Sequence, residues 1–237
     1  CPRVAAYLLW KQRKTLKFDH KELMTNNGRF NFRNQVWDNM FWSLASGVTV
    51  WSLYEVALMW GFANGYGFMF EFADNPFWFI ALFILLPFWQ AFAFYWIHRG
   101  LHWPPLYRIA HAVHHRNTNI GPWSGNSMHP IEHILWLSSV LIHWVIVSHP
   151  IHVLFFQQSQ VISAITNHSG FESIIVRDKN RLAMGDFFHQ LHHRYYECNY
   201  GSIETHWDKV FGTFHDGTEE GLEITRRRKK EMHQKIL

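Results

Sequence analysis

A long stretch without charged residues constrains the fold of this chain more than any other feature of its sequence. No Asp, Glu, Lys or Arg lies between Asp74 and Arg99, and residues 76–97 read PFWFIALFILLPFWQAFAFYWI. As an α-helix this stretch would be about 33 Å long, which matches the hydrocarbon core of a bilayer. Pro87 lies inside it, and membrane helices tolerate such a proline with a kink. The stretch therefore predicts a membrane-spanning helix.

A second uncharged stretch is too long for one crossing. It covers the 39 residues between Glu132 and Glu172, and a His-Pro pair at 149–150 interrupts it near its middle. Because proline ends or kinks a helix, we expect two apolar helices near 134–148 and 151–166. They would form a hairpin that crosses the membrane twice or re-enters it.

A third apolar stretch completes the expected fold. Residues 40–62 are apolar except for Glu55, a carboxylate that is costly inside a membrane. We expect an all-α integral membrane protein, with about four transmembrane helices in two hairpins and a cytosolic helical cap. Residues 1–237 form a single domain in this interpretation. Core helices of a soluble protein are the alternative, which the number of apolar stretches disfavours.

The basic residues predict which ends of the helices face the cytosol. Lys and Arg number 8 in residues 1–39, 3 in residues 98–133 and 11 from residue 170 onward, whereas residues 64–75 contain none. Cytosolic loops carry the excess of Lys and Arg, so both termini and the 98–133 loop are expected in the cytosol. The net charge of +4 is modest, and no basic groove indicates nucleic-acid binding.

Histidine is unusually abundant, with 18 residues spread from His20 to His233. The only cysteines, Cys1 and Cys198, exclude a disulfide scaffold and a cysteine-based zinc ribbon. Three clusters stand out: HRGLH at 98–102, HAVHH at 111–115 and HQLHH at 189–193. Residues at i, i+3 and i+4 share one face of a helix, so each cluster can present its imidazoles in one direction.

The number of clustered histidines favours two metal ions. The three clusters supply eight imidazoles, whereas one zinc ion takes about four ligands. Imidazole suits iron, zinc, copper and nickel, so the spacing alone does not identify the element. The first cluster directly follows the predicted helix at 76–97, which places the site at the boundary between membrane and cytosol.

These motifs together resemble the fatty acid hydroxylase and sterol desaturase superfamily of membrane di-iron oxygenases. The resemblance covers residues 76–217 and includes, besides the three clusters, SMHPIEH at 127–133, NHSG at 167–170 and NYGSIETHWDKVFGTFHDG at 199–217. It implies two irons and O2-dependent attack on an unactivated C–H bond. The ligands that it implies are His98, His102, His111, His114, His115, His168, His189, His192 and His193. His206 departs from the pattern, since related sequences often have proline between the neighbouring Thr and Trp.

Acidic residues near the clusters are candidates for orienting the ligands. They are Asp186, Glu132, Glu204 and Asp208. His129 and His133 form the motif HPIEH, and His129 is expected to line the pocket or to bond a ligand histidine, with metal ligation as the alternative. A contribution of His133 to the site stays open. His143 and His152 are candidates for core or tunnel positions. The remaining histidines are expected to be structural or exposed.

The sequence as a whole predicts a membrane oxygenase that hydroxylates a lipid-like substrate, such as a sterol or a fatty acyl chain. Desaturation of the same class of substrate is the alternative, and zinc can replace iron in purified protein. No dinucleotide fingerprint or four-cysteine iron–sulfur motif is present, so electrons are expected from a separate reductase, ferredoxin or cytochrome b5 type partner. The bacterial inner membrane and the endoplasmic reticulum both fit. A metal transporter, a bis-histidine haem protein and a zinc hydrolase are more remote alternatives.

Overall fold

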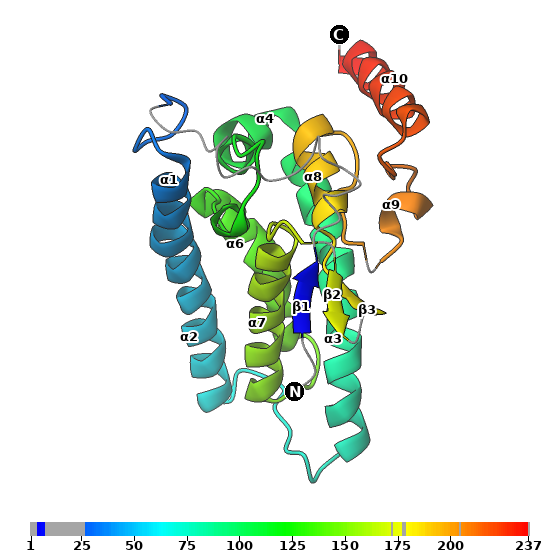
Figure 1. Ribbon diagram of the computed structural model, residues 1–237. Helices are drawn as coiled ribbons and strands as arrows, with labels where there is room; N and C mark the ends of the chain where they lie inside the picture. The colour runs from blue at the N-terminus through cyan, green and yellow to red at the C-terminus, as the bar shows by residue number, and fades with distance from the viewer. Residues whose placement is uncertain (1–3, 8–26, 172, 177–178, 204, 237) are drawn as a thin grey trace.

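Three long helical segments lie side by side and carry a smaller set of helices at one end (Figure 1). The computed structural model describes residues 4–7, 27–171, 173–176, 179–203 and 205–236. The long segments run through α2, α3 and α7, and the helices at their shared end include α4 and α8.

The first long segment is a continuous helical column. It consists of α1 (Gln35–Phe41), the π-helical segment η4 (Trp42–Val48) and α2 (Thr49–Ala63). The column begins at Asn34, whose side chain accepts hydrogen bonds from the backbone N–H groups of Val36 and Trp37. This cap satisfies donors that have no partner inside the helix.

The second long segment is α3 (Pro76–Leu101), which covers the whole uncharged stretch. Asn75 caps its first turn, Pro76 occupies the first helical position, and Pro87 is accommodated inside. Among the described helices, α3 alone has the length and apolarity of a membrane span. The predicted helix at 76–97 is therefore present, and it continues by one turn into the first histidine cluster.

The hairpin expected after Glu132 is present in altered form. Its first arm is α6 (Pro130–Leu137) followed by the 3-10 segment η7 (Ser138–Trp144), and its second arm is α7 (Pro150–Thr166). The first arm is shorter than a crossing requires, since a bilayer span takes about 20 α-helical residues. The described helices therefore do not by themselves establish four crossings.

The cap at the shared end consists of short elements. They are α4 (Pro104–Leu106), the π-helical turn η5 (Tyr107–His111), α5 (Ala112–His115), the 3-10 turn η6 (Pro122–Ser124), α8 (Asp186–Tyr195) and α9 (Trp207–Val210). The longer α10 (Glu219–Ile236) follows them.

The expectation of an all-α chain was wrong in one detail. Strands β1 (Val4–Tyr7), β2 (Ser173–Val176) and β3 (Lys179–Ala183) form a small antiparallel sheet in that order. The Ile-Ile-Val run of β2 is β-branched, which favours a strand over a helix. The fold is thus mostly helical with a minor sheet.

The core lies between the three long segments. Its largest cluster joins Leu58 of α2, Leu82 and Leu86 of α3, and Val153 and Phe156 of α7. The outer surfaces of the same helices are apolar as well: Leu53 is 64% exposed, Phe77 82% and Ile162 57%. Exposed apolar side chains on this scale call for an apolar surrounding or partner.

Candidate metal centre

Five histidines from four elements form the first of two groups, and all of them except the partly buried His102 are buried. His98 lies in the last turn of α3 and His102 is the C-cap residue of that helix. His111 comes from η5, His115 from α5 and His192 from α8. One ring nitrogen of each lies within 4.8 Å of the others, a spacing that one metal ion can bridge.

Four histidines form the second group. They are His114 of α5, His168 directly after α7, and His189 and His193 of α8, and their ligand nitrogens also lie within 4.8 Å of one another. All four side chains are buried. The two groups together contain the nine histidines of the implied ligand set.

Neighbouring residues on one helix serve different groups. His114 and His115 of α5 belong to the second and the first group, and so do His193 and His192 of α8. Consecutive residues of a helix point about 100° apart, so a short helix lying between the groups can reach both. This explains why the clusters contain adjacent histidines besides pairs spaced by three or four.

The outer ring nitrogens of several histidines are anchored to the protein. The Nδ1–H groups of His98 and His192 donate to the backbone carbonyls of Tyr200 and Cys198, both at 2.6 Å. Those of His168 and His114 donate to the carbonyls of Ala164 at 2.9 Å and Ser127 at 3.3 Å. A carbonyl only accepts, so Nδ1 carries the proton and Nε2 keeps a free lone pair. Anchored rings of this kind are typical of metal-binding histidines.

The Nε2 atoms of the histidines lie so close together that their lone pairs repel one another, and a bound cation would remove this repulsion. In the second group, Nε2 of His193 lies 3.1 Å from Nε2 of His114 and 3.1 Å from Nε2 of His168. Both of those partners present lone pairs, and a single N–H on His193 can satisfy only one of them. In the first group, the single lone pair of His192 Nε2 faces His102 at 3.2 Å and His115 at 3.0 Å.

These spacings fit metal coordination. Two nitrogens bound to one ion at about 2.1 Å, with bond angles of 90–109°, lie about 3.0–3.4 Å apart. The separations within both groups fall in this range. The donor set is nitrogen only, which suits iron, zinc, copper or nickel.

Burial keeps the clustered imidazoles neutral, the form in which they bind metals. Desolvation lowers the pKa of His114, His189, His192 and His193 well below the usual value, and repulsion from neighbouring imidazoles adds to the effect. Burial likewise lowers the pKa of His168 to about 4.

Of the acidic candidates, Glu132 touches the cluster directly. Its Oε1 lies 2.7 Å from Nδ1 of His111, and both side chains are buried. Burial raises the pKa of Glu132. A cation held by His111 would counter this by favouring the carboxylate.

Asp208 acts one step further away. Its carboxylate accepts hydrogen bonds from the backbone N–H groups of Tyr200 and Gly201, both at 2.8 Å, and from Thr213 at 2.6 Å. It thereby fixes the loop whose Tyr200 carbonyl anchors His98. The structure describes the backbone of Asp186 at the start of α8 but not its side chain, and Glu204 lies outside the described residues.

The other histidine candidates lie outside both groups. His129 caps α6 through the backbone N–H of Ile131, and His133 contacts the Ser46 hydroxyl at 2.7 Å. His143 contacts Ser148 at 3.0 Å, and His152 donates to the Phe79 carbonyl at 2.9 Å. His206 is exposed. The anchoring carbonyls of Ala164, Cys198 and Tyr200 were missed, because a backbone acceptor has no signature in the sequence.

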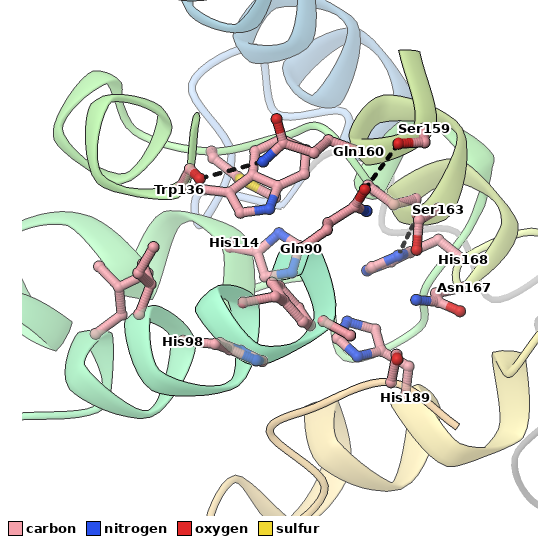
Figure 2. Close-up of a pocket in the computed structure, with 18 of the residues that line it drawn as sticks. Gln90, His98, His114, Trp136, Ser159, Gln160, Ser163, Asn167, His168 and His189 are labelled. Atoms are coloured by element: carbon pink, nitrogen blue, oxygen red, sulfur yellow. Dashed lines mark hydrogen bonds between the residues drawn. The ribbon is translucent and has the colours of Figure 1, made fainter. Parts of the chain in front are cut away.

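A cavity of about 390 Å³ opens beside the histidines. Figure 2 shows His98 and His114 on one side of it and His168 and His189 on the other, with Ser159, Gln160 and Ser163 of α7 along a further wall. Apolar side chains from α3 and α6, including Phe88, Phe94 and Trp136, make up much of its lining. Members of both histidine groups thus face a mostly apolar pocket.

Fold and site together define a mostly helical protein with two imidazole-only groups, each able to hold a metal ion, beside a lipid-sized apolar pocket. The chain belongs to the fatty acid hydroxylase family, whose model matches residues 83–213, more than half of the sequence. This match confirms the resemblance seen in the motifs.

Curated relatives of the chain include sterol desaturases from fungi. The chain is 28% identical to a Delta(7)-sterol 5(6)-desaturase of Aspergillus fumigatus over 182 residues, which cover 72% of this chain and 49% of the relative. It is 30% identical to the Delta(7)-sterol 5(6)-desaturase of Saccharomyces cerevisiae over 125 residues, 51% of this chain and 32% of the relative. The chain thus matches half or less of the length of these relatives. No solved structure matches it.

Proposed function

We propose that the two histidine groups hold two iron ions. The first site would use His98, His102, His111, His115 and His192, and the second His114, His168, His189 and His193. Iron changes its oxidation state and reacts with O2, which zinc does not, and purified protein can carry zinc in its place. The lone-pair contacts within each group support the presence of a cation.

The protein oxidises an unactivated C–H bond of a lipid-like substrate with O2 and external electrons. The observation that carries this proposal is that members of both histidine groups line the apolar cavity. When bound, the iron pair supplies oxygen activation. The chain supplies the pocket, which excludes water and holds an apolar body against His98, His114, His168 and His189.

Hydroxylation and desaturation remain the two outcomes of this chemistry. The family name favours hydroxylation, whereas the names of the fungal relatives favour desaturation of a sterol. Transport of metal is disfavoured, because the histidines lie at the ends of α3 and α7 and in the cap elements instead of forming a path along the long helices.

The same interpretation places the protein in a membrane as a multi-pass protein, with termini and metal centre facing the cytosol. The apolar outer faces of α2, α3 and α7 and the basic residues flanking the apolar stretches support this orientation. The fungal relatives favour the endoplasmic reticulum as the location. In a bacterial inner membrane the protein would have the same orientation, with its termini in the cytosol. Electrons come from a separate reductase, ferredoxin or cytochrome b5 type donor.

The ligand assignment is tested by replacing one histidine in the cluster and one outside it. His192→Ala removes a ring that contacts two neighbours of the first group, so bound iron should fall by about half or more and oxidation should be lost. His206→Ala changes an exposed histidine and should leave both unchanged. Iron content is measured on protein purified from iron-replete cells.

The type of reaction is tested in parallel by lipid analysis of cells with and without the intact protein. With ¹⁸O-labelled O2, hydroxylation adds one labelled oxygen to the product, whereas desaturation removes two hydrogens and adds none.

Full iron content and turnover in His192→Ala would contradict the proposed metal centre.

A further inference from the structure

A single amide side chain lies within the uncharged stretch of α3, the most apolar of the described helices. Gln90 is the only Asn or Gln within residues 76–97 and lies near the middle of α3. A polar group in such a helix is costly unless it has a partner, and it often marks a ligand path. Gln90 lines the cavity, as do Phe94 and His98 at the next two four-residue steps of the same helix.

The side-chain amide of Gln90 has one hydrogen-bond partner among the described residues, so one of its two polar groups is free. Figure 2 shows it reaching across the pocket from α3 to Ser159 of α7, and the two side-chain oxygens lie 2.8 Å apart. The Ser159 hydroxyl lies equally close to the backbone carbonyl of Phe156, and it has one proton to donate.

Whichever acceptor the Ser159 hydroxyl donates to, one hydrogen-bonding group of the Gln90 amide is without a partner among the described residues. If Ser159 donates to Gln90, the Nε2–H₂ of Gln90 has no acceptor among the described residues. If Ser159 donates to Phe156, an inverted Gln90 amide donates to Ser159 and its oxygen is free. A ligand hydroxyl, which both donates and accepts, can satisfy either arrangement.

Further polar side chains continue from this point toward the histidines. Ser159 and Ser163 of α7 and its C-cap residue Asn167 follow one another at four-residue intervals on one face, and all three line the cavity. The side chains of Ser163 and Asn167 have no hydrogen-bond partner in the described part of the chain. These side chains form a polar edge of the cavity, which ends beside His168. Glu132, Gln160, Ser202 and Thr205 are further polar members of a mostly apolar lining.

We propose that this polar edge binds an alcohol group of the substrate, with the Gln90 amide as its principal hydrogen-bonding partner and Ser163 as its neighbour. The apolar body then lies against Phe94 and Trp136, and the carbon to be oxidised faces the histidines. The inference rests on the proposed function and restricts its substrate class to long or polycyclic alcohols.

The test measures binding and needs no turnover. The protein in lipid nanodiscs, without electron donor, is titrated with two pairs of probes: a Δ7-sterol and its 3-deoxy analogue, and a long-chain alcohol and the matching alkane. Binding is followed by tryptophan fluorescence, since Trp136 lines the pocket. The wild-type protein should prefer the alcohol in at least one pair by about five- to tenfold, the effect of one hydrogen bond. Gln90→Leu should reduce that preference to about onefold.

A matched control separates ligand binding from helix packing. Gln157 is a buried glutamine of α7 that donates to the Trp51 carbonyl of α2 at 3.3 Å and does not line the cavity. Gln157→Leu should change stability but keep the preference for the alcohol. If Gln90 only joins the helices, Gln90→Leu will weaken both members of a pair equally.

An unchanged preference for the alcohol in Gln90→Leu overturns the proposal. A wild-type protein that prefers the alcohol in neither pair of probes, or that binds none of the probes, overturns it as well. Failure of the oxygenase proposal would instead appear as absent iron or absent turnover. The two failures are therefore distinguishable.

Discussion

The histidines show, residue by residue, what the sequence can predict and what it cannot. The three clusters and the NHSG motif identify nine imidazoles, and the structure brings those nine together. The division into five and four could not be predicted. It depends on how α5 and α8 are rotated between the groups, which the spacing of their histidines does not specify.

Glu132 provides a test at the same scale. Glu132→Ala removes the group that holds Nδ1 of His111, so the ring can turn away from the first site. We expect metal affinity to fall about 10- to 100-fold, the usual effect of losing such a partner. Glu132→Gln keeps an acceptor oxygen and should retain most of the affinity. Metal competition with a chelator measures the affinity of each variant. A metal affinity equal to that of the wild-type protein in both variants would show that Glu132 does not orient His111.

At the scale of elements, the longest helix joins the pocket to the metal centre. α3 carries Gln90 and Phe94 on the cavity wall and ends in His98 and His102. Sequence analysis predicted this helix well, since its uncharged stretch is a local feature. It predicted the segment after Glu132 less well, because the 3-10 geometry of η7 depends on packing against α2 and α7.

Gly125 tests how closely two elements approach beside the site. A Cβ atom at this position would lie 2.8 Å from the backbone carbonyl carbon of Ala164 in α7, near the end that leads to His168. Gly125→Ala must displace backbone, so we expect destabilisation of about 1–3 kcal/mol and a loss of metal from the second site. Thermal unfolding and metal analysis provide the measurements.

Gly100 is the matched control, because a Cβ atom there meets nothing within 4 Å. This glycine lies in the last turn of α3, where alanine is the better helix former. Gly100→Ala should therefore leave stability unchanged or raise it slightly. Equal effects of the two substitutions would argue against the close approach at Gly125.

At the scale of the whole molecule, apolar surface lies outside and neutral imidazoles lie inside. The long helices expose large apolar side chains around their outer faces, whereas the histidine groups are mostly buried. Composition averages conceal this arrangement, since the mean hydropathy of the chain is only −0.16. The uncharged stretches of the sequence nevertheless predicted the apolar long helices.

The buried imidazoles predict that protein stripped of metal becomes less stable in acid. Burial lowers the pKa of both His133 and His168 to about 4, below the value of about 6.5 expected in the unfolded chain. Between these pH values the unfolded state binds more protons than the folded state. The free energy of unfolding therefore falls as the pH drops from about 6.5 toward 4, by up to about 1.4 kcal/mol per pH unit for each histidine. Unfolding measured in detergent after chelation should show this slope, and a flat profile from pH 7 to 5 would contradict it.

The anchoring of the imidazoles by main-chain carbonyls has an evolutionary consequence. The groups that hold His98, His114, His168 and His192 belong to the peptide backbone, which every residue type provides. Lineages can exchange the side chains at Ser127, Ala164, Cys198 and Tyr200, so far as packing permits, without removing an anchor. An ancestral centre of this kind can persist while its surroundings diverge toward new substrates.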